Sequence, residues 1–442
     1  MINKKIPLLV VLSFPHAVFA SGFIDDSKLT VNFTNMYINN KYDTPVANST
    51  TGRYSSRNEE WAQGYNVLYQ SGYTSGLIGL GLDANVNGGI KLSGNSDHHT
   101  GGTMIPTGGS NGSGARSWGR FGAAVKLRVS ETEVRYGNNL KFKLPVVISN
   151  NARVTPQYFQ GLNISSKDVR HAEINAGYLN KVVGRWSTDR TGLAVAGGTK
   201  ASDGFYFGGV DYHFTKNITG QYYISQLEDY YIQNYLGAKW RIPVTKESSF
   251  ETEARYFNSR SSGRNGETGY KASGYTKNND GKIDNNTWSL SETYRLGYHS
   301  LLAGYQQVSD GSLMPTLNQA SLKNKEASGV NYYLYTDRMF YNFTRAGERT
   351  RYVQYSYDFT GVNIPGLTFK VAYLKGDNIK QRAMASAKEF ERDISLAYVF
   401  PSGTLKGLGI EWRNGLSKTN NIYDNTKGNN RNWLIMTYNL KF

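Results

Sequence analysis

Strict alternation of apolar and polar residues constrains this chain more than any other feature. From Phe121 to Val129 every second side chain is apolar, and the residues between them are small or basic. From Ile78 to Val86 aliphatic residues alternate in the same way with glycine, Asp83 and asparagine. Because side chains of a β-strand alternate between two faces, each segment has one wholly apolar face and one wet face. The apolar face has to meet a protein core or lipid.

The pattern favours strands whose apolar face meets lipid. Apart from the N-terminus, no segment approaches the ~18 consecutive apolar residues that a membrane-spanning helix requires. From Leu29 onward the sequence period is two, and the alternating segments number about eighteen, which is enough for a barrel with an aqueous channel. We therefore predict an all-β fold, a transmembrane antiparallel β-barrel of about 18 strands.

The connections between these segments alternate between short and long. The short ones are Ser130–Glu131, Lys167–Val169, Thr215–Asn217 and Pro243–Lys246. The long ones are Ser93–Ser117, the stretch after Gly137, Asn180–Ser202, Asn258–Asn286, Ser309–Glu348 and Ser417–Asn430. Short turns at one end and long loops at the other are typical of outer-membrane barrels. The last predicted strand, Trp433–Phe442, ends on an aromatic residue, which resembles the terminal signal of bacterial outer-membrane barrels.

The first twenty residues are typical of a signal peptide. Lys4 and Lys5 precede the apolar run Ile6–Phe14, and small residues at Val18 and Ala20 suit cleavage after Ala20. The alternative is a membrane anchor, but Pro15 and its neighbours interrupt the run. We predict a signal peptide at 1–20 and one barrel domain at 21–442. The chain has no cysteine, which excludes disulfides and thiolate metal sites.

The formal charge is +16, from 50 basic and 34 acidic side chains. The basic residues alternate within strands instead of clustering, which favours an anion-attracting surface over nucleic-acid binding. By strand parity the inward basic residues are Lys126, Arg128, Arg135, Lys239, Arg241, Arg255, Arg295, Lys370 and Arg413. In a closed barrel they would line one lumen, where guanidinium groups bind carboxylates in a bidentate manner. The alternative is a solvated face with counter-charges, since Glu133, Glu251, Glu253 and Glu411 share it.

One stretch is too long for a hairpin turn and too apolar to extend into water. It lies between Gly137 and Gly161, at about 138–160, and we predict that it folds back into the lumen as a constriction loop. It contributes Lys141, Lys143 and Arg153 and contains no Asp or Glu, so it should favour anions. An ordinary surface loop with its own small apolar cluster is the alternative.

Several short motifs in this order resemble the OprD-type porins, the outer-membrane carboxylate channels. They are Gly22–Ser27 (GFIDDS), Glu60–Tyr65 (EWAQGY), Arg135–Gly137 (RYG), Leu144–Pro145, Asn150–Gly161, Gln233–Gly237 (QNYLG), Tyr305–Gln307 (YQQ) and Asn363–Leu367 (NIPGL). The resemblance covers nearly the whole mature chain. It implies a monomeric 18-stranded barrel of a Gram-negative outer membrane, with an arginine ladder and selective diffusion of small carboxylates. Arg135 and Arg153 are the residues of this chain that match the family's motif, and the resemblance implies a role for them in the lumen. The acid-free constriction loop departs from members expected to take basic amino acids.

Other functions have less support in the sequence. None of the six histidines joins a nucleophile elbow or a metal motif, so no enzyme, cofactor or metal is predicted. We expect His98 and His99 to be solvated in their glycine-rich loop. An uncharged-sugar porin of the chitoporin type remains open, with Tyr223 and Tyr235 as stacking residues. A barrel enzyme is the least favoured alternative. The expected partners are small anionic or carboxylate solutes, outer-membrane lipid and lipopolysaccharide.

Overall fold

The computed structural model describes residues 22–48, 51–94, 97–101, 103–319, 331–382 and 384–442. Within these ranges eighteen long antiparallel strands form a closed barrel, which confirms the predicted fold class and strand number. They are β1 (Lys28–Ala47), β2 (Tyr54–Gln70), β3 (Gly79–Ser93), β6 (Ser117–Val129), β7 (Thr132–Leu140), β10 (Tyr158–Ser166), β11 (Ala172–Val183), β14 (Phe205–Thr215), β15 (Ile218–Leu227), β16 (Tyr231–Pro243), β17 (Ser248–Ser261), β18 (Asp284–Leu296), β19 (His299–Val308), β21 (Arg349–Asp358), β22 (Leu367–Ile379), β23 (Ala387–Val399), β24 (Gly409–Thr419) and β25 (Gly428–Lys441).

Nine short elements are found in the same ranges besides these eighteen strands, and one of them, β12, pairs with β11 of the wall. They are α1 (Gly22–Asp25), β4 (Thr107–Gly108), β5 (Ser113–Gly114), β8 (Lys143–Leu144), β9 (Val147–Ile148), β12 (Arg190–Thr191), β13 (Leu193–Ala194), β20 (Asn318–Gln319) and the 3₁₀ helix η1 (Phe359–Val362). The predicted signal peptide, 1–20, lies outside the described residues. None of the helices found in those residues is long and apolar enough to cross a membrane.

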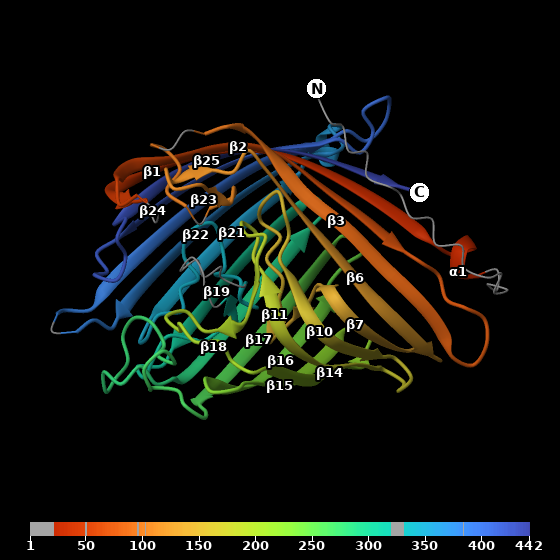
Figure 1. Ribbon diagram of the computed structural model, residues 1–442, viewed down its shortest axis with the longest axis horizontal. Helices are drawn as coiled ribbons and strands as arrows, with labels where there is room; N and C mark the ends of the chain where they lie inside the picture. Colours follow the sequence, from red (N-terminus) through yellow and green to blue (C-terminus); the bar gives the residue numbers. More distant parts are fainter. Residues whose placement is uncertain (1–21, 49–50, 95–96, 102, 320–330, 383) are drawn as a thin grey trace, which may run out of the picture.

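The barrel closes where the first strand meets the last. In Figure 1, β1 lies beside β25, and their register runs from Thr30 opposite Lys441 to Tyr42 opposite Asn429. Leu29 and Phe442 exchange two further backbone hydrogen bonds of 3.0 and 2.9 Å. Closure leaves no open sheet edge, so the backbone groups of the wall are paired, as a lipid environment demands.

The alternation of the sequence sets the two faces of the wall. Leu80, Phe121 and Val125 point outward and are 51%, 60% and 56% exposed. Asp83 and Lys126, on the same strands but with opposite parity, point inward and are buried. The outer surface is therefore apolar and suited to lipid, while the polar side chains face the lumen.

The connections are sorted as the sequence predicts. The turn between β6 and β7 is two residues long, and Ser130 takes a left-handed conformation there (φ 53°). Long loops lie at the opposite end. The last strand begins at Gly428, five residues before the predicted start at Trp433. The added segment is polar on both faces, so it carries no alternation that a sequence could reveal.

The constriction loop folds into the lumen, as predicted. It spans residues 141–157, a little less than predicted, because β7 continues to Leu140 and β10 begins at Tyr158. Its Phe142 ring packs edge-on against Phe159 of β10 and Phe207 of β14, with centroids 5.8 and 5.5 Å apart. These aromatic contacts attach the loop to the inner wall.

A second loop, between β19 and β21, also enters the lumen with its described residues (309–319 and 331–348), which the sequence did not predict. The ring of its Tyr333 stands edge-on to Tyr235 of β16 at 5.8 Å, and its Tyr341 packs with Phe343 beside Leu302 of β19. We call it the β19–β21 loop. Two loops, entering from different parts of the wall, thus narrow the channel.

Candidate functional site

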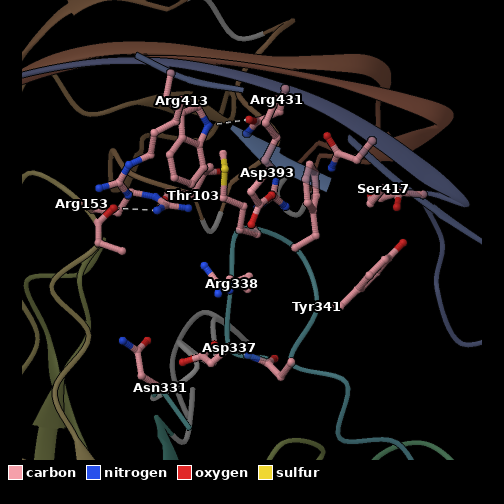
Figure 2. Close-up of a pocket in the computed structure, with 18 of the residues that line it drawn as sticks. Thr103, Arg153, Asn331, Asp337, Arg338, Tyr341, Asp393, Arg413, Ser417 and Arg431 are labelled. Atoms are coloured by element: carbon pink, nitrogen blue, oxygen red, sulfur yellow. Dashed lines mark hydrogen bonds between the residues drawn. The ribbon is translucent and has the colours of Figure 1, made fainter. Parts of the chain in front are cut away.

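A cavity of about 850 Å³ lies between the two loops and the wall formed by β22 to β25. Figure 2 shows Arg153 of the constriction loop on one side, Asp337, Arg338 and Tyr341 of the β19–β21 loop below, and strand residues above them. The described residues that line it include seven basic and four acidic side chains. We call it the constriction cavity.

Glu391 of β23 fixes the β19–β21 loop at this cavity. Its carboxylate accepts hydrogen bonds from the backbone N–H groups of Met339 (2.9 Å), Phe340 (3.1 Å) and Tyr341 (2.9 Å). Glu391 is fully buried. One carboxylate therefore satisfies three loop donors that would otherwise be buried without partners, which is costly to undo.

Arg120 of β6 fixes the constriction loop in a comparable way. Its guanidinium donates to the carbonyl oxygens of Pro156 (2.9 Å) and Gly184 (2.7 Å) and to the side chain of Asn87 (3.0 Å). The constriction loop is thus joined both to the wall and to the following loop, between β11 and β14.

Arg153, the constriction-loop arginine predicted from the sequence, lies in the constriction cavity. Its Nε donates to the carbonyl oxygen of Thr103 at 3.0 Å, and its guanidinium lies 4.6 Å from the ring centroid of Trp433. Burial, together with the nearby Arg185 and Arg431, holds the pKa of Arg153 well below its ordinary value. The cation is held in place but poorly compensated.

Four further arginines of the cavity escaped the sequence analysis, and one of them, Arg345, pairs with Glu389 at 2.9 Å. Arg431 of β25 lies over the Phe340 ring at 4.2 Å, and Arg185 lies over the Trp186 ring at 4.8 Å. Arg338 donates through Nε to the carbonyl oxygen of Tyr335 at 3.0 Å. Burial beside Arg431 lowers the pKa of Arg185 to about 10. Arg431 shares the parity of Trp433 and was missed only because the predicted strand began too late, whereas nothing in the sequence places the three loop arginines.

Most of this positive charge has no counter-charge in the described part of the chain. No carboxylate there lies within 4.0 Å of a guanidinium nitrogen of Arg153, Arg185, Arg338 or Arg431, or of the Lys370 ammonium group. Arg413, by contrast, is held in a bidentate pair by Glu411, with 2.7 and 2.8 Å between nitrogen and oxygen. Of the predicted residues, Arg153 and Lys370 therefore supply uncompensated charge to the cavity.

Carboxylates nevertheless reach the same cavity, although the constriction loop has none. Asp337 accepts hydrogen bonds from the backbone N–H of Tyr332 (2.9 Å) and from the Asn342 amide. Burial raises the pKa of Asp337 to about 7, against these hydrogen bonds and the field of Arg185. The constriction is thus not purely positive, although its loop is free of acids, because the β19–β21 loop and β23 (Asp393) bring acids opposite it.

A second cavity of about 420 Å³ lies against β11 and β14 to β17. It contains Lys143 of the constriction loop and Lys239, and Lys239 lies 3.3 Å from Glu251 and 3.4 Å from Glu253. Glu251 also pairs with Arg295 at 3.1 Å. Arg255 pairs with Glu253 and stacks on the rings of Tyr333 and Tyr335. The counter-charges anticipated from the sequence are therefore in place along this part of the wall.

The other predicted basic residues lie away from the constriction cavity, and most of them are engaged by neighbouring side chains. Lys126 lies 2.9 Å from Asp83 and is only 6% exposed, and Arg135 pairs with the other oxygen of Asp83. Arg128 stacks on the ring of Tyr73 at 4.0 Å. Arg241 is exposed at the short-turn end of β16. Lys141 lies 5.7 Å from the Tyr158 ring centroid, and burial lowers its pKa. None of these five residues is among the described residues that line the constriction cavity.

Two expectations from the sequence are wrong. His99 is not solvated: it is 1% exposed, with Nδ1 2.6 Å from Glu60 and Nε2 3.1 Å from Thr107, because the loop before β4 folds onto β2. Tyr223 and Tyr235 do not offer rings for sugar stacking, because both are buried under the two loops. Within the described ranges, no group of three or more His, Cys, Asp or Glu residues is arranged to hold a metal ion.

The sequence matches a family model described as outer membrane porin, OprD family, over residues 21–442. Porin D of Pseudomonas aeruginosa is 28% identical over 417 residues, covering 91% of this chain and 88% of that protein. The porin-like protein GalP of Pseudomonas putida is 29% identical over 432 residues, covering 97% and 95%.

Solved structures show the same likeness. Pseudomonas aeruginosa OccK8 (OprE) has a TM-score of 0.84 at 39% sequence identity, covering 95% of this chain and all of that one. Pseudomonas aeruginosa OpdK, crystallised with vanillate, has a TM-score of 0.82 at 28% identity, with the same coverage. The family and the fold suggested by the sequence are thereby confirmed.

Proposed function

This chain belongs to the OprD family of outer membrane porins, and from that premise we propose that it is a selective channel for small solutes bearing a carboxylate group. It is a multi-pass β-barrel of the Gram-negative outer membrane, and its family and fold are those of porins, not of enzymes. The proposal concerns what passes through the lumen and which residues select it.

One observation carries the proposal: four arginines and Lys370 converge on the constriction cavity with no carboxylate of the described residues within 4.0 Å. Because like charges held together in a partly buried space repel, an anion entering the cavity is stabilised. Guanidinium groups bind a carboxylate through paired hydrogen bonds, which favours it over a spherical anion. That OpdK was crystallised with vanillate, a carboxylate, is consistent with this reading.

The basic residues of the constriction cavity have different roles. Arg153 and Arg431 flank Trp433, at 4.6 and 5.8 Å from its ring, and are the best placed to contact one solute together. Lys370 continues the positive path along the wall on β22, whereas Arg413 of β24 is balanced by Glu411. Several sites of moderate strength suit conduction, because a solute has to leave each one. No cofactor takes part.

The test compares benzoate with benzamide, which has nearly the same size but no charge. We would reconstitute the wild type and the variant Arg153→Gln/Arg431→Gln in liposomes and measure both fluxes. A lost charge-assisted hydrogen bond contributes about 1.5–3 kcal/mol, so benzoate flux should fall about tenfold or more while benzamide flux stays the same.

The matched control is Arg260→Gln, which removes one positive charge from the outer face of β17. It should leave both fluxes unchanged. Equal slowing of benzoate and benzamide in the double variant would show that these arginines only shape the wall, and the channel would then be one for neutral solutes.

A further inference from the structure

Five basic residues gather on the outside of the barrel, near its long-loop end. They are Arg349 and Arg351 of β21, Lys375 of β22, Lys388 of β23 and Lys418 of β24, and we call them the rim patch. All five are exposed. Their neighbours of opposite parity, among them Thr350, Leu374 and Ser417, face inward and are buried. The rim patch is therefore separate from the lumen.

The strand register brings like charges together in this patch. Arg351 lies directly opposite Lys375, and Phe390 separates Lys375 from Lys418 along the same row. Side chains directly opposite on neighbouring strands are about 5 Å apart at Cβ, and like charges there are destabilising. A wall selected only for stability has no need of such a pair.

The register also sets the depth of the patch. The next row toward the short-turn end is Val353, Tyr373, Arg392 and Leu416, and the one after it is Tyr355, Val371, Ile394 and Asn414. Arg392 within these rows donates to Asn414. Apolar and aromatic residues predominate there, as on a lipid-facing band. The rim patch thus stands directly above that band, at the level of the outer-leaflet head groups.

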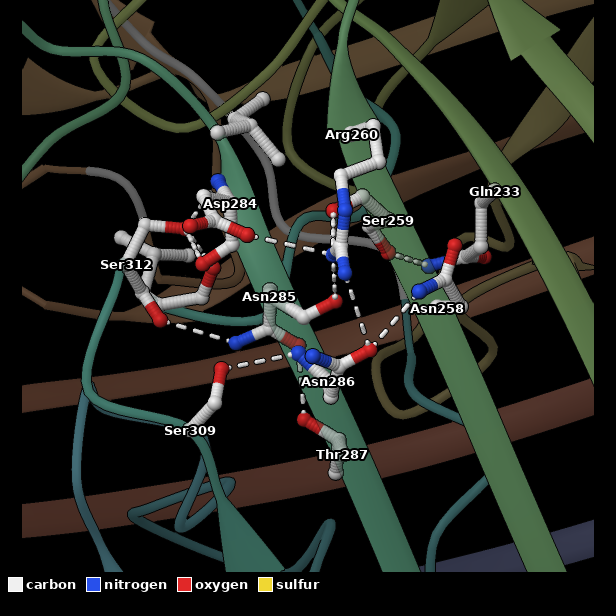
Figure 3. A network of polar contacts seen from close by, with 12 residues as sticks. Gln233, Asn258, Ser259, Arg260, Asp284, Asn285, Asn286, Thr287, Ser309 and Ser312 are labelled. Atoms are coloured by element: carbon white, nitrogen blue, oxygen red, sulfur yellow. Dashed lines mark hydrogen bonds and ion pairs between the residues drawn. The ribbon is translucent and has the colours of Figure 1, made fainter.

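Only part of the positive charge of the rim patch is balanced by carboxylates of the described residues. Asp377 pairs with Arg351 at 3.2 Å and Asp43 with Lys418 at 2.7 Å. No carboxylate of those residues lies within 4.0 Å of Arg349, Lys375 or Lys388. Elsewhere on the rim a basic residue is balanced: Figure 3 shows Arg260 of β17 joined to Asp284 (3.2 Å) and to Asn286 (3.4 Å).

We propose that the rim patch binds the phosphate groups of lipopolysaccharide in the outer leaflet, with the acyl chains lying against Val353, Tyr373 and Leu416. The phosphates neutralise the opposed pair Arg351 and Lys375, and basic residues at a membrane surface attract such head groups. A second copy of this chain is a poor occupant, because a symmetric contact would set two rim patches against each other. The assignment does not depend on which solute the channel carries.

The experiment uses the full mature chain refolded in a zwitterionic detergent. Binding of bisphosphorylated lipid A is measured for the wild type and for Arg349→Gln/Lys375→Gln/Lys388→Gln. At about 1 kcal/mol for each basic residue near the surface, the triple variant should bind about 100-fold more weakly. Lys216→Gln/Lys246→Gln/Lys406→Gln, in the short turns, removes the same charge and should bind like the wild type.

Three further arms separate the possible ligands. Dephosphorylated lipid A should not bind the wild type measurably, and phosphatidylglycerol and inorganic phosphate should compete with lipid A only weakly. Equal affinity of wild type and triple variant would overturn the proposal, as would phosphatidylglycerol or phosphate binding as tightly as lipid A. If the triple variant does not assemble, Lys375→Gln alone, which relieves the opposed pair, should bind about fivefold more weakly.

Discussion

At the scale of single residues, the neighbours of a basic side chain decide whether it supports the wall or attracts a solute. Lys126 and Arg135 both pair with Asp83, which is fully buried, and Arg135 also lies 3.7 Å from Glu133, so two carboxylates balance these two charges within the wall. Arg153 and Arg431 instead meet aromatic rings and backbone carbonyls, which hold a guanidinium without neutralising it. The same residue type thus has a structural role near the short turns and an electrostatic one at the constriction.

Substitution of Lys126 should therefore affect stability more than transport. Lys126→Met removes a buried pair with Asp83 at 2.9 Å and a hydrogen bond of 2.7 Å to the Ser71 carbonyl. We expect the free energy of unfolding to fall by about 1–3 kcal/mol, with little change in the benzoate-to-benzamide flux ratio. The loss is limited because Asp83 keeps its pair with Arg135. Urea unfolding monitored by gel mobility gives the first quantity and liposome flux the second. A large change of flux ratio in a stable variant would place Lys126 on the solute path.

Asp337 should make the channel sensitive to pH. Its pKa is raised to about 7, so the folded protein binds this proton more tightly than the unfolded chain does, and the group is neutral below pH 7 and negative above it. Lowering the pH from 8 to 5.5 should therefore increase the anion-to-cation permeability ratio. Asp337→Asn should show the high ratio at both pH values, because its oxygen can still accept from the Tyr332 N–H.

The measurement is the reversal potential across a planar bilayer in a salt gradient. Asp280→Asn, at a half-buried position of the loop between β17 and β18, serves as the control, and the variant should respond to pH like the wild type. A pH response that persists unchanged in Asp337→Asn would assign the titration to another carboxylate.

At the scale of elements, strands could be predicted from the sequence and loop positions only in part. Alternation fixes which side of a strand is wet, so the parity of residues such as Lys239 and Arg413 followed directly. The constriction loop could be predicted because its apolar residues have to be buried against another part of the protein. The β19–β21 loop gives no such signal, since it is placed by Glu391, a residue of a distant strand whose role depends on the tertiary structure.

Removing the constriction loop should widen the channel without dismantling the barrel. Deletion of Leu140–Gln157 takes Lys141, Lys143 and Arg153 out of the lumen together with the Phe142 contacts. Apart from Leu140, which pairs with Phe159 at the end of β7, these residues take no part in the ladders of the wall, so we expect assembly with higher conductance and a lower benzoate preference. Heat-modifiable gel mobility checks assembly, and single-channel recording checks conductance. An assembled mutant with unchanged conductance would mean that the β19–β21 loop alone sets the narrowest point.

At the scale of the whole molecule, the barrel separates three chemical environments with one repeating pattern. Outward residues face lipid, inward residues form ion-pair networks, and the two inserted loops gather unpaired cations in one cavity. The fold and its family were accessible from the sequence because alternation, loop sorting and terminal motifs agree. The site was less accessible, because four of its five uncompensated cations lie in loops or beyond a predicted strand end, and only Arg153 of these four was predicted.

The charge of the lumen should act at two ranges, which salt can separate. The Debye length is about 30 Å at 0.01 M and about 3 Å at 1 M, so the field of scattered wall charges is screened at high salt. We expect clear anion selectivity in dilute salt that declines toward 1 M. Direct contacts of Arg153 and Arg431 with a carboxylate are much less screened, so benzoate should still pass faster than benzamide at 1 M. Reversal potentials and paired fluxes measured over this range test both parts. Cation selectivity in dilute salt would overturn the predicted anion selectivity. Loss of the benzoate preference at 1 M salt would show that direct contacts with the carboxylate do not contribute to selection.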